Sequence, residues 1–258
     1  MAYLLAHDLG TSGNKAVLYS ETGILIASCL QTYSTQYPHD GWVEQDAKDW
    51  WKAVCKSTKQ LLETTRIAPA EVAAISFSAQ MMGCLPVDQA GIPLRPMITW
   101  ADTRASRQET WMLERASMDR VYAVTGHRVS ASYAAAKLLW IRENEPEVFK
   151  KTAHMLQAKD YVIYRMTGQI VTDYSDASGT NLLDIREKRW SQELLNAWEI
   201  PASILPELHP STDIAGTITQ RAALETGLLE GTPVVIGGGD GSCACVGAGV
   251  VQLSLIHI

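Results

Sequence analysis

Three short apolar runs open the chain, and the turns that separate them contain glycine. The runs are Tyr3–Leu9, Ala16–Ser20 and Ile24–Leu30. Runs of this length favour β-strands, and connections this short favour antiparallel neighbours. A long helix from about Asp46 to Thr65 follows, because its apolar residues recur on one helical face. With a strand at Val72–Ser78, the opening unit is predicted to be β-β-β-α-β.

The remaining pattern predicts short strands around a helical middle. The expected elements are a strand pair at Cys84–Val87 and Pro96–Trp100, helices at Ala134–Asn144 and Ala158–Met166, strands at Ile214–Thr219 and Pro233–Gly237, and a helix at Gln220–Leu228. No internal repeat or low-complexity linker divides the chain. We therefore expect one α/β domain with a helical insert.

The amino-acid composition argues against several classes of function. Among the 258 residues acidic side chains outnumber basic ones, for a net charge of −6, and no basic run occurs. This balance argues against nucleic acid or a membrane surface as a partner. The five cysteines form no CxxC pair and the histidines share no ligand spacing, so we expect neither a disulfide framework nor a metal cluster. No signal peptide or membrane helix is evident, and a reducing cytoplasm is the expected location.

The first candidate site is the segment Asp8-Leu9-Gly10-Thr11-Ser12-Gly13-Asn14-Lys15, which lies between two predicted strands. Its glycines let the backbone turn sharply and approach an anion. Its N–H groups and hydroxyls could hold phosphate oxygens, and Asp8 could hold a hydrated Mg²⁺. The alternative is an ordinary hairpin turn in which Asp8 bonds to its own backbone. The segment alone does not decide between the two.

The second candidate is Gly237-Gly238-Gly239-Asp240-Gly241-Ser242, which follows an apolar strand. Glycines let a substrate lie against the backbone while Asp240 faces it. A carboxylate so placed could accept a proton from a hydroxyl nucleophile. The alternative is a strand-to-helix turn with Asp240 as the N-cap.

Two further segments are weaker signals. In Trp100-Ala101-Asp102-Thr103-Arg104 an indole lies beside two charges, which suits a sugar's apolar face and its hydroxyls. The alternative is a buried Trp with a local ion pair. Gln80-Met81-Met82-Gly83 offers an amide, and its methionines could equally be core residues.

In this order, the four segments resemble the FGGY family of carbohydrate kinases, most of all the xylulokinases. The segments Trp42–Asp46, Lys137–Trp140, Lys159–Tyr161 and Ser175–Thr180 add to the likeness, which covers about residues 1–252. The resemblance implies an actin-like, ribonuclease-H-like fold in which two domains enclose ATP and a sugar. Residues 1–252 would be the N-terminal, sugar-binding domain, and the second domain is missing from the chain. Residues 253–258 do not look like the family, so we expect a truncated frame or a junction there.

The resemblance also implies roles for individual residues. Asp8 matches the Mg²⁺ site, and Gly10, Thr11, Ser12 and Lys15 match the phosphate loop for ATP. The sugar pocket is matched by Gln80, Met81, Met82, Trp100, Asp102 and Arg104. Asp240 matches the base that deprotonates a sugar hydroxyl for attack on the γ-phosphoryl group of MgATP. The full-length protein would then be a cytoplasmic ATP- and Mg²⁺-dependent kinase, with a homodimer as one possible assembly.

Two departures from the xylulokinase pattern leave the identity of the sugar undecided. Xylulokinases commonly carry His where this chain has Met82, and an amide residue where it has Gly241. D-Xylulose is the first expectation, with another ketose or a polyol as the alternative. A non-catalytic sugar-binding module is a second hypothesis, and an actin-like ATPase a third, which the Asp240 and Trp100 segments disfavour. Because half of the cleft is absent, we expect the chain alone to bind nucleotide poorly and to turn over negligibly.

Overall fold

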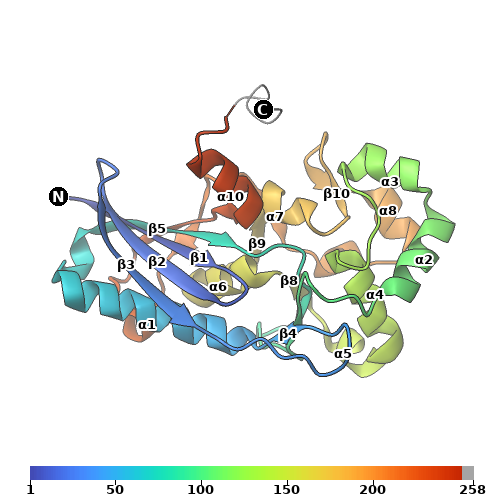
Figure 1. Ribbon diagram of the computed structural model, residues 1–258, viewed down its shortest axis with the longest axis horizontal. Helices are drawn as coiled ribbons and strands as arrows, with labels where there is room; N and C mark the ends of the chain where they lie inside the picture. The colour runs from blue at the N-terminus through green and yellow to red at the C-terminus, as the bar shows by residue number, and fades with distance from the viewer. Residues whose placement is uncertain (252–258) are drawn as a thin grey trace.

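The centre of the protein is a seven-stranded mixed sheet (Figure 1). The computed structural model describes residues 1–251. The strand order is β13-β14-β5-β1-β2-β3, and β15 pairs with the end of β5. The strands are β1 (Tyr3–Leu9), β2 (Gly13–Ser20), β3 (Leu25–Thr32), β5 (Val72–Ala79), β13 (Ile214–Thr217), β14 (Pro233–Val235) and β15 (Gly238–Gly239). The predicted antiparallel meander of the first three strands is confirmed.

Helix α1 (Ala47–Thr65) carries the chain from the meander to the fourth strand of the unit. The side chain of Asp46 caps its first turn by accepting from the Lys48 N–H at 2.9 Å, and Arg66 ends it in a left-handed conformation. Its apolar face, including the buried Trp50, packs against the sheet. The chain then returns as β5, parallel to β1, which completes the predicted β-β-β-α-β unit.

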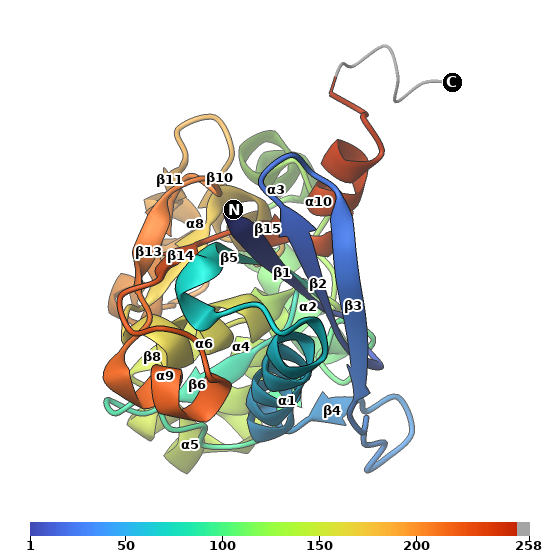
Figure 2. The ribbon, with the colours of Figure 1, turned by 90° about the vertical axis from the view of Figure 1, so that its left-hand side faces the viewer.

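The sheet has different neighbours on its two faces. Helix α1 runs along one face, and α10 (Asp240–Gly247) lies beside the other (Figures 1 and 2). On β1, Leu5 and Leu9 point into the core on the α1 side, while Leu4 and Asp8 on the other side are exposed. The apolar core therefore lies between the sheet and α1, and the opposite face stays open toward α10.

The helical insert forms a second core, centred on residues such as Leu139 and Trp198. The elements outside the central sheet and α1 are β4 (Glu44–Gln45), β6 (Leu85–Val87), β7 (Met97–Ile98), α2 (Ser106–Arg115), α3 (Met118–Thr125), α4 (Ala134–Asn144), α5 (Pro146–Lys151), β8 (His154–Leu156), α6 (Ala158–Thr167), β9 (Val171–Asp173), α7 (Tyr174–Ser178), β10 (Leu183–Asp184), β11 (Arg189–Trp190), α8 (Gln192–Ala197), β12 (Glu207–His209) and α9 (Gln220–Thr226). The predicted α/β class with a helical insert is confirmed.

One predicted pairing is wrong. The segments near residues 84–87 and 96–100 do not form a strand pair of their own. Strand β6 pairs with β8, β7 pairs with β4, and only an isolated bridge between Cys84 and Ile98 joins the two segments. One of these partners, β8, follows in the chain and the other, β4, precedes, and both β6 and β7 are fully buried. Within residues 1–251, no helix is long and apolar enough to cross a membrane.

Candidate functional site

Three neighbouring parallel strands, β1, β5 and β15, end at the same edge of the sheet. Asp8 on β1 is in register with Ser78 on β5, and β15 pairs with the same end of β5. The segments just beyond these ends therefore come together: the Gly10–Gly13 turn, Gln80 and Asp240. Ligands of open α/β sheets bind at the carboxyl ends of strands. The fold thus brings together three of the segments predicted from the sequence.

The turn after β1 directs its carbonyl groups into the protein. The Gly10 N–H donates to the Gly13 carbonyl at 3.0 Å, which closes the turn. The Gly10 carbonyl accepts from the Tyr33 hydroxyl at 2.5 Å, and the Thr11 carbonyl accepts from Gln45 Nε2 at 2.6 Å. These two oxygens therefore already have donors within the protein. Thr11 is partly exposed and Ser12 is exposed, and both carry hydroxyls at this turn.

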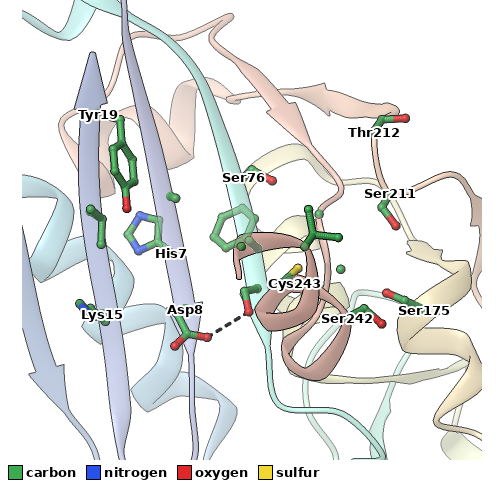
Figure 3. Close-up of a pocket in the computed structure, with 18 residues that line it drawn as sticks. His7, Asp8, Lys15, Tyr19, Ser76, Ser175, Ser211, Thr212, Ser242 and Cys243 are labelled. Atoms are coloured by element: carbon green, nitrogen blue, oxygen red, sulfur yellow. Dashed lines mark hydrogen bonds between the residues drawn. The ribbon is translucent and has the colours of Figure 1, made fainter. Parts of the chain in front are cut away.

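Asp8 and Lys15 lie opposite each other on β1 and β2, and both side chains are exposed. The Ser78 hydroxyl donates to one carboxylate oxygen of Asp8 at 3.1 Å (Figure 3). The described residues contain no cluster of three His, Cys, Asp or Glu that could hold a metal alone. A single exposed carboxylate suits Mg²⁺, which is usually bound through one or two carboxylates, waters and substrate phosphates. The residues present therefore fit a MgATP complex.

Gln45, buried beside the turn, connects it to β5. Its Oε1 accepts from Gln80 Nε2 at 2.7 Å and from Trp50 Nε1 at 3.1 Å. The indole of Trp100 also reaches the turn, because its Nε1 donates to the Thr11 hydroxyl at 3.0 Å. Trp100 is 43% exposed. The structure therefore brings the predicted sugar residues Gln80 and Trp100 into the same site as the predicted phosphate loop.

Met81 and Met82 follow Gln80 and approach two glycine-containing segments. A Cβ on Gly239 would lie 2.4 Å from Met81 Sδ, so Met81 packs directly against the backbone next to Asp240. Met82 has a φ of 63°, a left-handed conformation that is uncommon for a residue other than glycine. Its carbonyl accepts from the buried Lys137 Nζ at 2.8 Å, which holds this turn.

The side chains of Asp102 and Arg104 lie in the interior. The Arg104 guanidinium donates from Nε and Nη2 to the Asp102 carboxylate at 2.7 to 3.0 Å, and Nη1 lies 2.7 Å from Glu44 Oε1. It also stacks on Trp42, 3.8 Å from the ring centroid. Asp102 is fully buried and accepts from the Val43 N–H at 2.6 Å. Sugar contact by these two side chains stays a prediction, whereas their mutual pairing is what the structure shows.

Asp240 is the first residue of α10, and Gly239 rather than Asp240 is the N-cap. Burial raises the pKa of Asp240, and the negative charge of Asp8 raises it further. The Gly241 N–H, which donates to the Asp240 carboxylate at 2.7 Å, acts against this rise without cancelling it. The preceding turn requires glycine, because Gly237 has a φ of 72° and a Cβ there would lie 1.9 Å from the Phe77 carbonyl oxygen. A carboxylate with a raised pKa is a better proton acceptor than an ordinary one.

A polar network behind this junction was missed by the sequence analysis. Asp173 caps α7, and it also pairs with the buried Lys159 Nζ at 3.1 Å. Its other oxygen accepts from the Ser175 and Ser211 hydroxyls at 2.5 and 2.7 Å. Ser175 in turn accepts from the Gly239 N–H at 3.0 Å. The local signal, an Asp followed by Ser two residues later, indicates a cap and does not reveal the distant partners.

A cavity of about 540 Å³ lies between α10 and the open face of the sheet (Figure 3). Strands β1, β2 and β5 form its floor, with Val17 and Phe77 among the apolar residues. Asp8 and Ser78 lie toward the strand ends, and Cys243 of α10 faces the cavity from the other side. The cavity therefore adjoins the site at the strand ends.

A family model matches this chain over residues 3–247. Its description is the N-terminal domain of the FGGY family of carbohydrate kinases. The chain belongs to this family. Its segments at the strand ends therefore belong to a carbohydrate-kinase domain, and the resemblance seen in the sequence is confirmed.

Named relatives and solved structures agree with the family. The chain is 39% identical to a xylulose kinase of Bacillus subtilis over 98% of its own length and 50% of that protein. It is 33% identical to a glycerol kinase of Trichormus variabilis, covering 96% of the chain and 49% of the relative. The crystal structure of a xylulose kinase from Rhodospirillum rubrum superposes with a TM-score of 0.92 at 27% identity, over 97% of this chain and 51% of that one. The actin-like sugar-kinase fold is thereby confirmed.

The chain spans about half the length of the curated relatives that it matches. The predicted domain of residues 1–252 stays a prediction. The tail at residues 253–258 lies outside the described residues.

Proposed function

We propose that the protein carrying this domain phosphorylates a sugar hydroxyl with ATP, most simply that of a ketopentose such as D-xylulose. The observation that supports the proposal most directly is the position of Asp240. It follows β15 at the same sheet edge as the Gly10–Gly13 turn and Gln80. A proton acceptor, a phosphate turn and a sugar-facing segment at one edge are the parts that phosphoryl transfer needs.

In this proposal Asp240 is the general base. The sugar hydroxyl gives its proton to the Asp240 carboxylate while its oxygen forms a bond to the γ-phosphorus, and the bond from that phosphorus to the β-phosphate oxygen breaks. The raised pKa of Asp240 favours this transfer. Asp8 would hold Mg²⁺, and Gly10, Thr11, Ser12 and Lys15 would bind phosphate oxygens. MgATP supplies the phosphoryl group when it is bound, and the protein contributes position and charge.

The sugar would lie between Trp100 and the Gln80–Met82 turn. An exposed indole offers an apolar surface to a sugar ring or chain, and Gln80 Oε1 is a buried acceptor without a protein partner in the described structure. Asp102 and Arg104, paired with each other in the interior, would fix the segment that carries Trp100. The xylulose kinases among the relatives favour D-xylulose, and the glycerol kinase keeps a polyol as the alternative.

The test begins with the coding DNA beyond the codon for Gln252. The frame found there is expressed and assayed for ADP release with D-xylulose, other ketoses and glycerol. We expect turnover with at least one of them, and negligible turnover from residues 1–258 alone, because relatives with this activity are twice as long.

Asp240→Ala should then lower turnover by roughly 10²–10⁴-fold with sugar binding retained, the range of general-base catalysis. Asp119→Ala, at an exposed position of the helical insert, is the matched control. Unchanged turnover in Asp240→Ala would refute the base role. Sugar binding without any turnover in the protein of full length would favour the non-catalytic alternative.

A further inference from the structure

The hydroxyl of Ser175 links α7 to the strand-to-helix junction that precedes Asp240. Its oxygen accepts from the Gly239 N–H at 3.0 Å, across 64 residues of sequence. We propose that Ser175 is a positioning residue for Asp240, acting through the backbone of Gly239. The catalytic part of this inference rests on the proposed function of Asp240.

The direction of the hydrogen bonds is set by Asp173. An ionised carboxylate only accepts, so the Ser175 hydroxyl at 2.5 Å must donate its proton to Asp173 Oδ2. The Ser175 N–H donates to the same oxygen at 2.8 Å, which fixes the residue through backbone and side chain together. The hydroxyl then has only lone pairs left to offer. These lone pairs receive the Gly239 N–H, so Ser175 connects the carboxylate to the junction in one orientation.

A buried lysine keeps Asp173 ionised. Burial alone raises the pKa of Asp173, but Lys159 and the bonds from Ser175 and Ser211 outweigh it, and the net pKa is lowered. For Lys159 the effects have the opposite sign. Burial lowers its pKa, but the neighbouring carboxylates of Asp160, Asp176 and Asp173 outweigh burial, so the net pKa of Lys159 is raised. Both members of the pair therefore stay charged. The orientation of Ser175 persists because its acceptor stays a carboxylate.

The junction also has little room to move. A Cβ on Gly238 would lie 2.9 Å from Ser175 Oγ, and one on Gly239 would lie 2.4 Å from Met81 Sδ. The backbone therefore runs between Ser175 on one side and Met81 on the other. Since Asp240 is the next residue and begins α10, a shift of Gly239 moves its carboxylate directly. Displacements of about 1 Å in a reacting group can lower rates about 10²-fold.

Amide hydrogen exchange of Gly239, followed by NMR in the 258-residue chain, tests the positioning role without any catalysis. Ser175→Ala removes the acceptor, and we expect Gly239 to exchange about fivefold faster, as for the loss of one hydrogen bond. Ser211→Ala is the matched control, because it removes a bond to the same Asp173 oxygen but does not touch Gly239. Ser175→Thr keeps the hydroxyl at a position that lines the adjoining cavity. Equal exchange in Ser175→Ala and the wild type would overturn the proposal.

Kinetics of the protein of full length separate positioning from a merely structural role. We expect Ser175→Ala to lower kcat about tenfold or more with the sugar KM nearly unchanged, and Ser175→Thr to restore it. Faster exchange of Gly239 with an unaltered kcat would refute the catalytic part. If the wild type phosphorylated no sugar, the proposed function would fail, and the exchange rates would still decide whether Ser175 holds the junction.

Discussion

The indole Nε1 of Trp100 donates to the hydroxyl of Thr11 at 3.0 Å. These residues belong to segments 89 positions apart, one predicted to contact a sugar and the other a phosphate. The bond holds the two segments next to each other at the site. A ligand that contacts Trp100 is thereby placed next to the turn after β1.

Trp100→Phe keeps an aromatic surface and removes this bond. Without the bond the ring at position 100 is no longer held beside the turn, and we expect D-xylulose to bind about fivefold more weakly, a change of about 1 kcal/mol. Isothermal titration calorimetry on the chain measures it. Trp111→Phe, in the helical insert, should leave the affinity unchanged. Equal weakening in both variants would mean that the Trp100 bond has no specific part in binding.

Asp102→Asn tests whether the buried pair with Arg104 is structural. Removing the charge leaves a guanidinium with 1% side-chain exposure beside Glu44 alone, and breaking a buried pair typically destabilises a protein by about 3–5 kcal/mol. We expect a large loss in the free energy of unfolding in urea. Glu193→Gln, which breaks an exposed pair with Arg120, should change it little. Intact stability with lost sugar binding would instead make Asp102 a direct ligand of the sugar.

Gly237→Ala should destabilise the junction before Asp240. A left-handed residue other than glycine is strained by roughly 1–3 kcal/mol, and here the new Cβ also meets the Phe77 carbonyl at 1.9 Å. Gly241→Ala is the control, since in the described part of the chain a Cβ there would meet nothing within 4 Å apart from its chain neighbours and its own helix backbone. Thermal unfolding of both variants checks the difference. A Gly237→Ala variant as stable as Gly241→Ala would show that the turn can adopt another conformation.

The sequence predicts the first half of the sheet well, because its signals are local. The glycine turns bound β1, β2 and β3, and the apolar helical face marks α1 to within a residue or two. Strands β6 and β7 were paired wrongly, since their true partners β8 and β4 lie far away in sequence. The periodicity of apolar residues along one segment contains no information about strand partners that are distant in sequence.

The same distinction holds at the site. Asp8, Gln80 and Asp240 could be named from motifs, and parallel strand ends then bring them together. The burial of Asp102 and Arg104 could not be predicted, because it depends on the stacking of the guanidinium on Trp42 and its pairing with Glu44. The role of Ser175 was missed for a similar reason: its partner Gly239 becomes a neighbour only after folding.

Lys137 provides a prediction of pH dependence. It is fully buried, and its Nζ donates to the carbonyls of Met82 and Ser132. Burial lowers the pKa of Lys137 to about 7, an effect that the nearby Cys84 and Asp102 oppose and that Arg104 reinforces. Burial raises the pKa of the Cys84 thiol to about 12, so this thiol does not titrate in the same range.

In the unfolded chain Lys137 titrates near its ordinary value of 10.5. Between the two pKa values the unfolded state binds more protons than the folded state, so Lys137 makes stability rise with pH in this interval. From pH 7 to pH 9 the wild type should gain up to roughly 2 kcal/mol in the free energy of unfolding relative to Lys137→Met, which has no such proton to release. Urea unfolding at both pH values measures this difference, and Lys59→Met, at an exposed position of α1, should follow the wild type. Parallel profiles for the wild type and Lys137→Met would mean that the Lys137 ammonium keeps its proton inside the folded protein, through its bonds to the two carbonyls.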